Sequence, residues 1–366
     1  MDHSLKLQNK ILQNSYRQKI EELKLNKGKS LFPSVIELDP TTACNLACHD
    51  CISANLLNQG GFERERLKDL AREFKDIGIK AVILIGGGEP MAHPEFGTIV
   101  DYLSDNGIHV GVTSNGTLIK KFFKPLSKCK WIRISMDSGT SEVYQKYRPH
   151  KSGVSQFDSV INQMKDLRKI YLNKLGYSFL ILSKNNDDGT FETNATDIEN
   201  AAYVAKEIGC NYFEVKPSFD MMHFLQSHSQ DTIRIVNDQL SKIRKIQDDS
   251  FSIISPGTLG DSLTGKLIQE KKYDRCLVAE MRTVISPSGT YVCPYHRGNL
   301  NMKIGDANKT NLKDIWKSEK RNEVMKKLNP KKHCTFHCIR NDTNNLLEEL
   351  MLKNKIDFTE DYDLFM

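Results

Sequence analysis

Three cysteines stand close together near the start of the sequence, Cys44, Cys48 and Cys51, with the spacing Cys-x3-Cys-x2-Cys. Residues 34–38 before them alternate in hydrophobicity and predict a strand, so we expect the cysteines in a loop at its carboxyl end. Such loops carry the chemistry in α/β barrels. Three thiolates are one short of a tetrahedral metal site, and closely spaced cysteines also hold iron–sulfur clusters. A zinc knuckle with a distant fourth ligand, or a chance group of buried thiols, also fits the spacing.

A glycine-rich turn follows further along the chain. Residues 80–85 are a nearly continuous apolar run, which predicts a strand buried on both faces. The run ends in Gly86, Gly87, Gly88, Glu89 and Pro90. Glycines let a ligand approach bare backbone, and the Glu89 carboxylate can accept a hydrogen bond from an ammonium group. Alone, a glycine-rich turn is weak evidence of function. Here it is specific evidence, because it follows the three-cysteine loop by one strand–helix unit.

The three-cysteine loop and the glycine-rich turn, in this order, resemble the radical S-adenosylmethionine (SAM) superfamily. The resemblance covers about residues 34–342. It implies a four-iron four-sulfur cluster on Cys44, Cys48 and Cys51, whose open iron chelates the amino and carboxylate groups of SAM. It also implies that the glycine-rich stretch contacts the SAM amino group, and that reductive cleavage of SAM gives a 5′-deoxyadenosyl radical that takes hydrogen from a substrate. The chain departs from the family at Asp50, where an aromatic residue usually packs against the adenine.

Polar residues stand at the ends of further predicted strands. Ser114 and Asn115 end the third strand, Ser135 and Asp137 flank the end of the fourth, and Arg148 follows in a Tyr-Arg-Pro sequence. By the resemblance, these positions touch the ribose and methionine parts of SAM, and the Arg148 guanidinium pairs with the SAM carboxylate. By residue type alone, Asn115 fits a turn residue and Arg148 a surface arginine.

Four more cysteines occupy the last hundred residues, with the spacing Cys-x16-Cys-x40-Cys-x3-Cys: Cys276, Cys293, Cys334 and Cys338. They suffice to close one metal site, and residues 283–292 between the first two predict a β hairpin. The region resembles the C-terminal auxiliary-cluster region of radical SAM enzymes, called SPASM or, when shortened to one cluster, twitch. Four cysteines imply the single-cluster form, although the chain departs by one residue between Gly289 and Cys293. The alternative is a structural zinc site.

The elements that must position these residues alternate between strand and helix, which predicts a parallel sheet. Strands are predicted at residues 34–38, 80–85, 108–113, 131–136, 177–182 and 212–215. Helices are predicted between them at residues 63–77, 94–106, 156–171 and 197–208, with one more ending at about residue 126. The fold class is therefore α/β, and the resemblance implies a partial (βα)6 TIM-like barrel with a small C-terminal auxiliary-cluster domain.

The sequence predicts five consecutive parts. They are an N-terminal helical extension at 1–33, a radical SAM core barrel at 34–220, a connector at 221–270, a SPASM- or twitch-like domain at 271–342 and a C-terminal tail at 343–366. The extension is expected to hold a helix from about residue 5 to 25 on the outside of the core. The connector is expected to hold a helix at about 231–245, followed by a Ser- and Gly-rich boundary.

Composition limits the class of protein. A chain of 366 residues with 39% hydrophobic content can form one large and one smaller domain. The net charge of +6 comes from basic residues spread along the chain, which does not favour a nucleic-acid partner. No apolar stretch fits a membrane span or a signal peptide, so a cytoplasmic protein is expected. Nine cysteines there favour metal or redox chemistry, with isolated Cys129 and Cys210 as buried bystanders.

The leading hypothesis is a radical SAM oxidoreductase that acts on a small polar substrate, such as a sugar, aminocyclitol or nucleoside, by net dehydrogenation. The four auxiliary cysteines resemble those of an aminocyclitol dehydrogenase of this superfamily, in which the auxiliary cluster can accept an electron. Oxidation of an alcohol also needs a base, for which the candidates by residue type are Tyr291, His296, Lys216 and Glu280. The sequence does not rank these candidates.

Two alternatives stay open. One is a radical SAM enzyme that cross-links or epimerises a ribosomal peptide, and the other is a zinc-stabilised nucleic-acid-binding protein without enzymatic activity. The expected partners of the leading hypothesis are a small-molecule substrate and a one-electron reductase such as flavodoxin or ferredoxin.

Overall fold

The computed structural model describes residues 7–185, 191–267 and 269–366. Residues 1–6 of the predicted extension and residue 268 of the predicted connector therefore lie outside the described residues. The chain forms two compact units. Among the described residues, unit 1 comprises residues 44–57, 112–185 and 191–267, and unit 2 comprises residues 7–43, 58–111 and 269–366. These units are not consecutive in sequence, and the five-part division of the chain stays a prediction.

The sheet of unit 2 has the strand order β12 (Lys303–Gly305), β11 (Gly289–Tyr291), β10 (Arg282–Ser286), β1 (Val35–Leu38) and β2 (Ala81–Leu84). Strand β1 lies between β10 and β2 and is parallel to both. All residues of β1 and β2 are buried, as expected for central parallel strands. β10 and β11 form the predicted hairpin. The parallel pairing of β10 with β1 was not predicted, and it joins the C-terminal region to the strand that leads to the three-cysteine loop.

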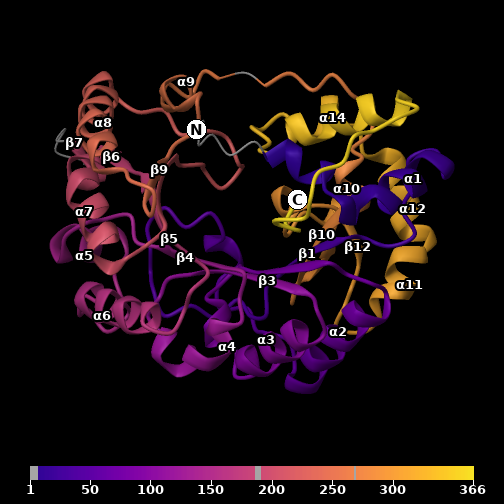
Figure 1. Ribbon diagram of the computed structural model, residues 1–366, viewed down its shortest axis with the longest axis horizontal. Helices are drawn as coiled ribbons and strands as arrows, with labels where there is room; N and C mark the ends of the chain where they lie inside the picture. Colours follow the sequence, from indigo (N-terminus) through magenta and orange to yellow (C-terminus); the bar gives the residue numbers. More distant parts are fainter. Residues whose placement is uncertain (1–6, 186–190, 268) are drawn as a thin grey trace. The chain divides into compact units, whose positions relative to one another are not determined.

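The helices of unit 2 show why these sequences fold as they do. α2 (Arg64–Asp76) buries Leu67, Leu70, Ala71 and Phe74, an i, i+3, i+4, i+7 pattern that gives one apolar face. The other helices are α1 (Arg17–Leu25), α3 (Phe96–Asp105), α10 (Val278–Met281), α11 (Leu312–Lys317), α12 (Glu319–Lys327), α13 (Pro330–His333) and α14 (Asn341–Leu352). Helices α11 and α12 lie beside β12, at the right of Figure 1.

The N-terminal extension differs from the single helix predicted for it. Two short 3₁₀ helices, Leu7–Leu12 and Asn14–Tyr16, precede α1. Between them, the Gln13 side chain is buried, and its amide bonds the backbone of Lys10, Tyr362 and Asp363. The side chain of Gln13 thus forms hydrogen bonds with the backbone of the C-terminal tail. This contact between distant segments, which local periodicity does not encode, coincides with the break between the two 3₁₀ helices.

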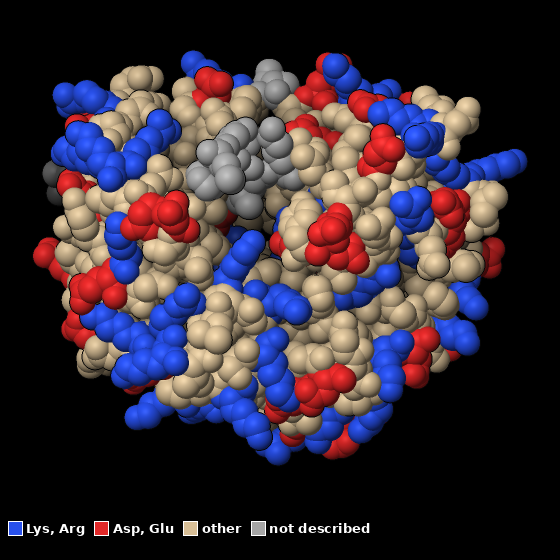
Figure 2. All heavy atoms as spheres, viewed as in Figure 1, with Lys and Arg blue, Asp and Glu red and all other residues tan. Residues whose placement is uncertain are grey.

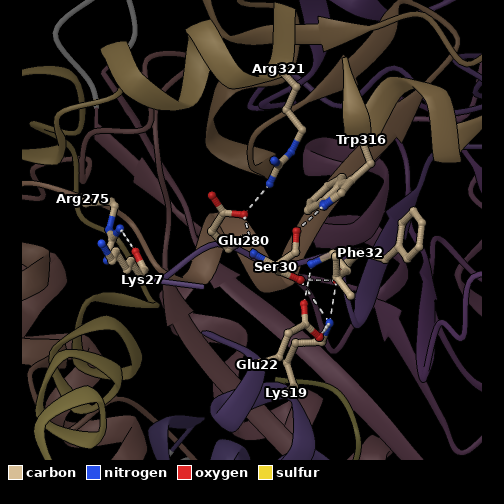
Figure 3. Close-up of polar contacts among 10 residues, drawn as sticks. Lys19, Glu22, Lys27, Ser30, Phe32, Arg275, Glu280, Trp316 and Arg321 are labelled. Carbon is tan, nitrogen blue, oxygen red and sulfur yellow. Dashed lines mark hydrogen bonds and ion pairs between the residues drawn. The ribbon is translucent and has the colours of Figure 1, made fainter. Parts of the chain in front are cut away.

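The loop after α1 is hydrogen-bonded to Glu280 and Trp316 in the C-terminal part of the chain, as Figure 3 shows. Ser30 donates its backbone N–H to Glu280 at 3.2 Å and accepts the indole N–H of Trp316 at 3.1 Å. Glu280 forms a buried ion pair with Arg321, whose guanidinium lies 3.8 Å from the Trp316 ring centroid. The extension is therefore part of the packed structure of unit 2.

The sheet of unit 1 contains β4 (Trp131–Ser135), β5 (Lys174–Ile181), β8 (Tyr212–Pro217) and β9 (Ser252–Ile254), in this order and all parallel. Strand β3 (His109–Ser114) contains residues of both units. The helices are α4 (Phe123–Ser127), α5 (Ser141–Tyr147), α6 (Phe157–Arg168), α7 (Ile198–Ile208), α8 (Gln230–Ile243) and α9 (Leu259–Leu263). Strand β9 and the hairpin of β6 (Ser183–Asn185) and β7 (Phe191–Thr193) were not predicted.

One face of this sheet is aromatic. Tyr177 and Phe179 of β5 contact Phe213 of β8, with ring centroids 5.8 and 6.0 Å apart. Helix α7 contacts both strands and ends at Gly209, whose φ of +85° is the left-handed conformation that glycine adopts readily. Because side chains alternate along a strand, the other face of β8 carries its charged residues.

The predicted α/β class, with a mostly parallel sheet, is confirmed. On the face shown in Figure 2, lysines and arginines are interspersed with acidic residues and form no continuous basic surface. Within the described residues, no helix has the length and apolar character needed to cross a membrane.

Candidate cofactor and cluster sites

The three-cysteine loop is held in place by backbone hydrogen bonds within unit 1. Ala47 donates its N–H to the carbonyl of Pro149 at 2.8 Å, and Lys151 donates to the carbonyl of Asn45 at 3.0 Å. The segment that receives the loop directly follows α5 and includes Arg148. The loop and Arg148 are thereby brought together, although about a hundred residues separate them in sequence.

The thiols of this loop are half-buried and close enough to affect one another. Burial raises the pKa of Cys48 to about 11, the Arg148 guanidinium opposes the shift, and the Cys51 and Cys44 thiols add to it. Three thiols that share one partly buried loop are costly to ionise without a cation, and bound iron would supply the positive charge. The donor set therefore fits the cluster that the spacing predicts.

The glycine-rich turn packs directly against the start of this loop within unit 2. A methyl group on Gly88 would lie 2.4 Å from the Thr42 carbonyl carbon and 2.5 Å from the Ala43 carbonyl oxygen, so only glycine fits. Glu89 is 2% exposed, and its carboxylate accepts the backbone N–H of Met91 at 3.0 Å. Pro90 begins the 3₁₀ helix Pro90–Ala92. The turn thus presents bare backbone and a fixed carboxylate, which fits the amino group of SAM.

Asp137 and Arg148 form a buried ion pair at the end of β4, with side chains 2% and 12% exposed. The Asp137 backbone is left-handed, with φ of +54°, and its carboxylate also accepts the N–H of Leu180 at 2.8 Å. The Arg148 Nε is buried and has no hydrogen-bond partner among the described residues. Arg148 is thus no surface arginine, and its Nε–H could receive a carboxylate such as that of SAM.

The remaining strand-end residues have local partners. Asn115 accepts the N–H of Thr117 in a turn, and its amide donates to Asn45 at 2.9 Å and lies 3.9 Å from the Cys44 sulfur. The Ser114 hydroxyl accepts the N–H of Gly116. Ser135, half-buried, is paired in register with Ser178 of β5. Asn45 was not predicted as a site residue, although its place next to Cys44 was a signal for it.

Cys276, Cys293, Cys334 and Cys338 are brought together in unit 2 from four segments. Cys276 precedes α10, Cys293 follows β11, Cys334 ends α13, and Cys338 stands three residues before α14. Burial raises the pKa of each thiol, and for Cys293 the other three thiols raise it further. Backbone N–H groups point at the sulfurs of Cys276, Cys293 and Cys338. Buried sulfurs that receive backbone N–H groups suit an iron–sulfur cluster.

Aromatic rings line the auxiliary cysteines. Tyr295 stacks on Phe336 with ring centroids 4.7 Å apart, and His296 Nε2 lies 3.7 Å from the Cys334 sulfur. Over the described ranges, no group of His, Cys, Asp and Glu is spaced to hold a single metal ion.

The four base candidates have different surroundings. Tyr291 is buried, and its hydroxyl donates a hydrogen bond to the Ser288 carbonyl. Glu280 forms an ion pair with Arg321 and accepts the backbone N–H of Ser30. His296 lies beside the auxiliary cysteines. Lys216 stands at the carboxyl end of β8 with its ammonium group 2.9 Å from Glu214. Of the four, Lys216 is the one at a strand end of unit 1, the unit that contains the three-cysteine loop.

Comparisons with known proteins identify the family. The sequence matches the family described as the radical SAM superfamily over residues 38–198, and the iron–sulfur cluster-binding domain SPASM over residues 276–339. It is 23% identical to the mycofactocin maturase MftC of Mycobacterium tuberculosis, over 78% of this chain and 71% of that protein. It is 28% identical to AlbA, the subtilosin biosynthesis protein of Bacillus subtilis, over 51% of this chain and 40% of AlbA.

Solved structures show the same fold. SuiB of Streptococcus suis, crystallised with the precursor peptide SuiA, has a TM-score of 0.63 and 17% identity, covering 95% of this chain and 79% of SuiB. The protein anSMEcpe with bound AdoMet has a TM-score of 0.58 and 16% identity, covering 87% of this chain and 96% of anSMEcpe. The predicted partial barrel with an auxiliary-cluster domain is confirmed by this similarity. The chain therefore belongs to the radical SAM superfamily, with a C-terminal SPASM domain, and its cofactors are SAM and iron–sulfur clusters.

Proposed function

We propose that this protein is a peptide-modifying radical SAM enzyme. The observation that carries the proposal is the similarity to MftC, a maturase, together with that to SuiB, which was crystallised with a precursor peptide. AlbA, named for bacteriocin biosynthesis, supports the same class. This is the first alternative raised by the sequence, and the comparisons favour it over the small polar substrate of the leading hypothesis. Iron–sulfur domains at both cysteine sets leave no support for the zinc-stabilised nucleic-acid binder.

The residues of the chain have distinct parts in this proposal. Cys44, Cys48 and Cys51 hold the cluster that binds SAM, while Glu89 and Arg148 orient its amino and carboxylate groups. When bound, these cofactors supply a 5′-deoxyadenosyl radical that takes a hydrogen atom from the peptide. The auxiliary cysteines close a cluster with no open iron, which suits it to accept one electron from the substrate radical. The substrate then loses one hydrogen atom, one electron and one proton, as in a cross-link.

The experiment uses anaerobically reconstituted protein, SAM, a strong reductant and each short peptide encoded beside the gene. A peptide that becomes two mass units lighter while 5′-deoxyadenosine accumulates supports an oxidative cross-link. A peptide of unchanged mass in ordinary water that gains one deuterium in deuterated water indicates epimerisation, which keeps the peptide class but removes the role of electron acceptor. Turnover of sugars or aminocyclitols, with no peptide altered, contradicts the proposal.

A further inference from the structure

An open recess of about 460 Å³ lies in unit 2, a volume within the range of ordinary ligand pockets. One wall is the loop that follows α1, with Lys27 and Lys29, and the other is formed by α11 and α12, with Trp316, Lys317 and Arg321. None of the cysteines of either set lines it. We call this site the basic recess.

The loop wall of the basic recess is held in place by hydrogen bonds. The backbone of Ser30 donates to Glu280 and accepts the indole N–H of Trp316, as Figure 3 shows. The Glu22 carboxylate of α1 accepts the next backbone N–H, that of Leu31. A ligand would therefore meet a wall that is formed in advance, which lowers the entropy cost of binding.

The two acids that bond this loop already have cations as partners. Glu22 forms an ion pair with Lys19 at 2.8 Å, and Glu280 forms its buried ion pair with Arg321. No acidic side chain of the described residues lines the recess itself. Arg321 is thus neutralised by Glu280, and neither Glu22 nor Glu280 balances the lysines that line the recess.

Three lysines give the basic recess its charge. Lys27, Lys29 and Lys317 are exposed, and none of them forms an ion pair within the described part of the chain. The Lys317 ammonium group lies 5.5 Å from the centroid of the Phe32 ring, a contact that leaves its charge uncompensated. The Arg275 guanidinium, which donates to the Lys27 carbonyl, adds positive charge beside them. The recess therefore complements an anionic ligand.

The remaining lining residues indicate what kind of anion fits. Leu25 and Leu31 are 84% and 61% exposed, and the amides of Asn26 and Asn322 can donate to and accept from a peptide main chain. Trp316 is only 2% exposed, so it offers no ring face on which a nucleic-acid base could stack. Lysines, amides and exposed leucines together suit a peptide with acidic and apolar side chains.

We propose that the basic recess binds an acidic stretch of the substrate peptide, in which Asp or Glu residues neighbour an apolar residue. The substrate class rests on the proposed function. Because no cysteine of either set lines the recess, the bound stretch is a recognition segment and not the residue that loses hydrogen. Lys27, Lys29 and Lys317 are the binding residues, and Leu25 and Leu31 contact the apolar side chain.

The test measures fluorescence anisotropy of two dye-labelled peptides on the reconstituted holoenzyme with SAM. They are Gly-Glu-Leu-Glu-Glu-Leu-NH₂ and its analogue with Gln in place of every Glu. The acidic peptide should bind about tenfold more tightly, and its affinity should fall as salt is added. Joint replacement of Lys27, Lys29 and Lys317 by Gln should weaken its binding about tenfold, because three exposed charge pairs are lost. Joint replacement by Arg, which keeps the charges, should preserve binding.

A matched control removes the same charge elsewhere in unit 2. Lys272, Lys309 and Lys355 are exposed and do not line the recess, so their joint replacement by Gln should leave binding unchanged. Iron content and melting temperature should match the wild type in all three triple variants. Equal binding of the two peptides, or equal losses from the two Gln triples, would overturn the proposal. Tighter binding of a six-nucleotide DNA through the same lysines would also overturn it.

The same experiment separates this proposal from the proposed function. If the acidic peptide binds through the three lysines but no peptide is ever modified, the recess assignment stands and the proposed function fails. If peptides are modified but the acidic probe does not bind, the proposed function stands and the recess assignment fails.

Discussion

The backbone N–H of Glu89 donates a hydrogen bond of 2.8 Å to the carbonyl of Ala43, the residue before Cys44. The turn assigned to SAM and the loop assigned to the cluster are thus joined at one point. The close fit of Gly88 against Thr42 and Ala43 reinforces this junction. Substitutions in the turn should therefore shift the backbone at the start of the three-cysteine loop.

Gly88→Ala should destabilise the protein by about 1–3 kcal/mol, because the added methyl group overlaps the backbone of Thr42 and Ala43. Gly87→Ala is the matched control, since its methyl group would meet its nearest neighbours at 3.6 and 3.7 Å, an ordinary contact. Urea unfolding of both variants measures the difference. Equal stability of the two variants would show that the backbone of Thr42 and Ala43 accommodates a methyl group at Gly88 without cost.

Glu89→Gln should weaken SAM binding by about 1–3 kcal/mol, because it removes a carboxylate that can pair with the SAM ammonium group. The amide oxygen of glutamine can still accept the N–H of Met91, so the local fold should persist. Calorimetric titration of the reconstituted protein with SAM measures the change. An unaltered affinity would show that the Glu89 carboxylate does not pair with the SAM ammonium group.

Two clusters predict two separable losses of iron. The wild type should hold about eight irons per chain, falling to about four when Cys44, Cys48 and Cys51 become Ala. Replacement of Cys334 and Cys338 by Ala should also leave about four, with 5′-deoxyadenosine release preserved. Cys129→Ala and Cys210→Ala, both buried outside the cysteine sets, are controls that should keep all the iron. A wild type with only about four irons contradicts the two-cluster assignment.

His228 should make the protein less stable in acid. The side chain is 7% exposed, and Nδ1 bonds the Ser183 hydroxyl at 2.7 Å, while Nε2 has no partner among the described residues. Burial lowers its pKa from 6.5 to about 4. Between these pH values the unfolded chain binds the proton more readily, so stability falls as pH decreases, by up to about 3 kcal/mol.

Denaturant unfolding of the wild type and His228→Gln from pH 7 to pH 4 measures this contribution. The variant should lose less stability over this range, because the titrating group is gone. Parallel pH curves for the two proteins would mean that His228 is accessible to protons in the folded state.

The sequence was sufficient where signals are local. The apolar runs around Val82 and Ile132 predicted β2 and β4, and thiol spacing predicted both cysteine sets, which the fold then brought together. Strand β9 was missed because three residues, Ser252–Ile254, give too short a pattern, and their pairing with β8 supplies the missing signal. The parallel pairing of β10 with β1 was missed because it joins segments about 250 residues apart.

Glu214 of β8 forms ion pairs with Arg133 and Lys216, and the sequence analysis missed Arg133 and Glu214 although a signal existed. Arg133 alternates with Ile132 and Ile134, and Glu214 alternates with Phe213 and Val215. Charges inside otherwise apolar strands indicate a second, polar face. Which strands share that face depends on register, and the sequence does not give the register. For the same reason, Lys216 entered only as one of four unranked bases.

The parallel pairing of β10 with β1 sets a limit on protein engineering. A chain truncated before Arg282 would leave one edge of Val35–Leu38 with unpaired backbone groups, and exposed apolar edges of this kind invite aggregation. An exchange of auxiliary regions between relatives should therefore keep the host's β10–β11–β12 ribbon and replace only the residues beyond Gly305. Because Cys276 and Cys293 precede that point and Cys334 and Cys338 come after it, such a chimera would draw its cluster ligands from both parents.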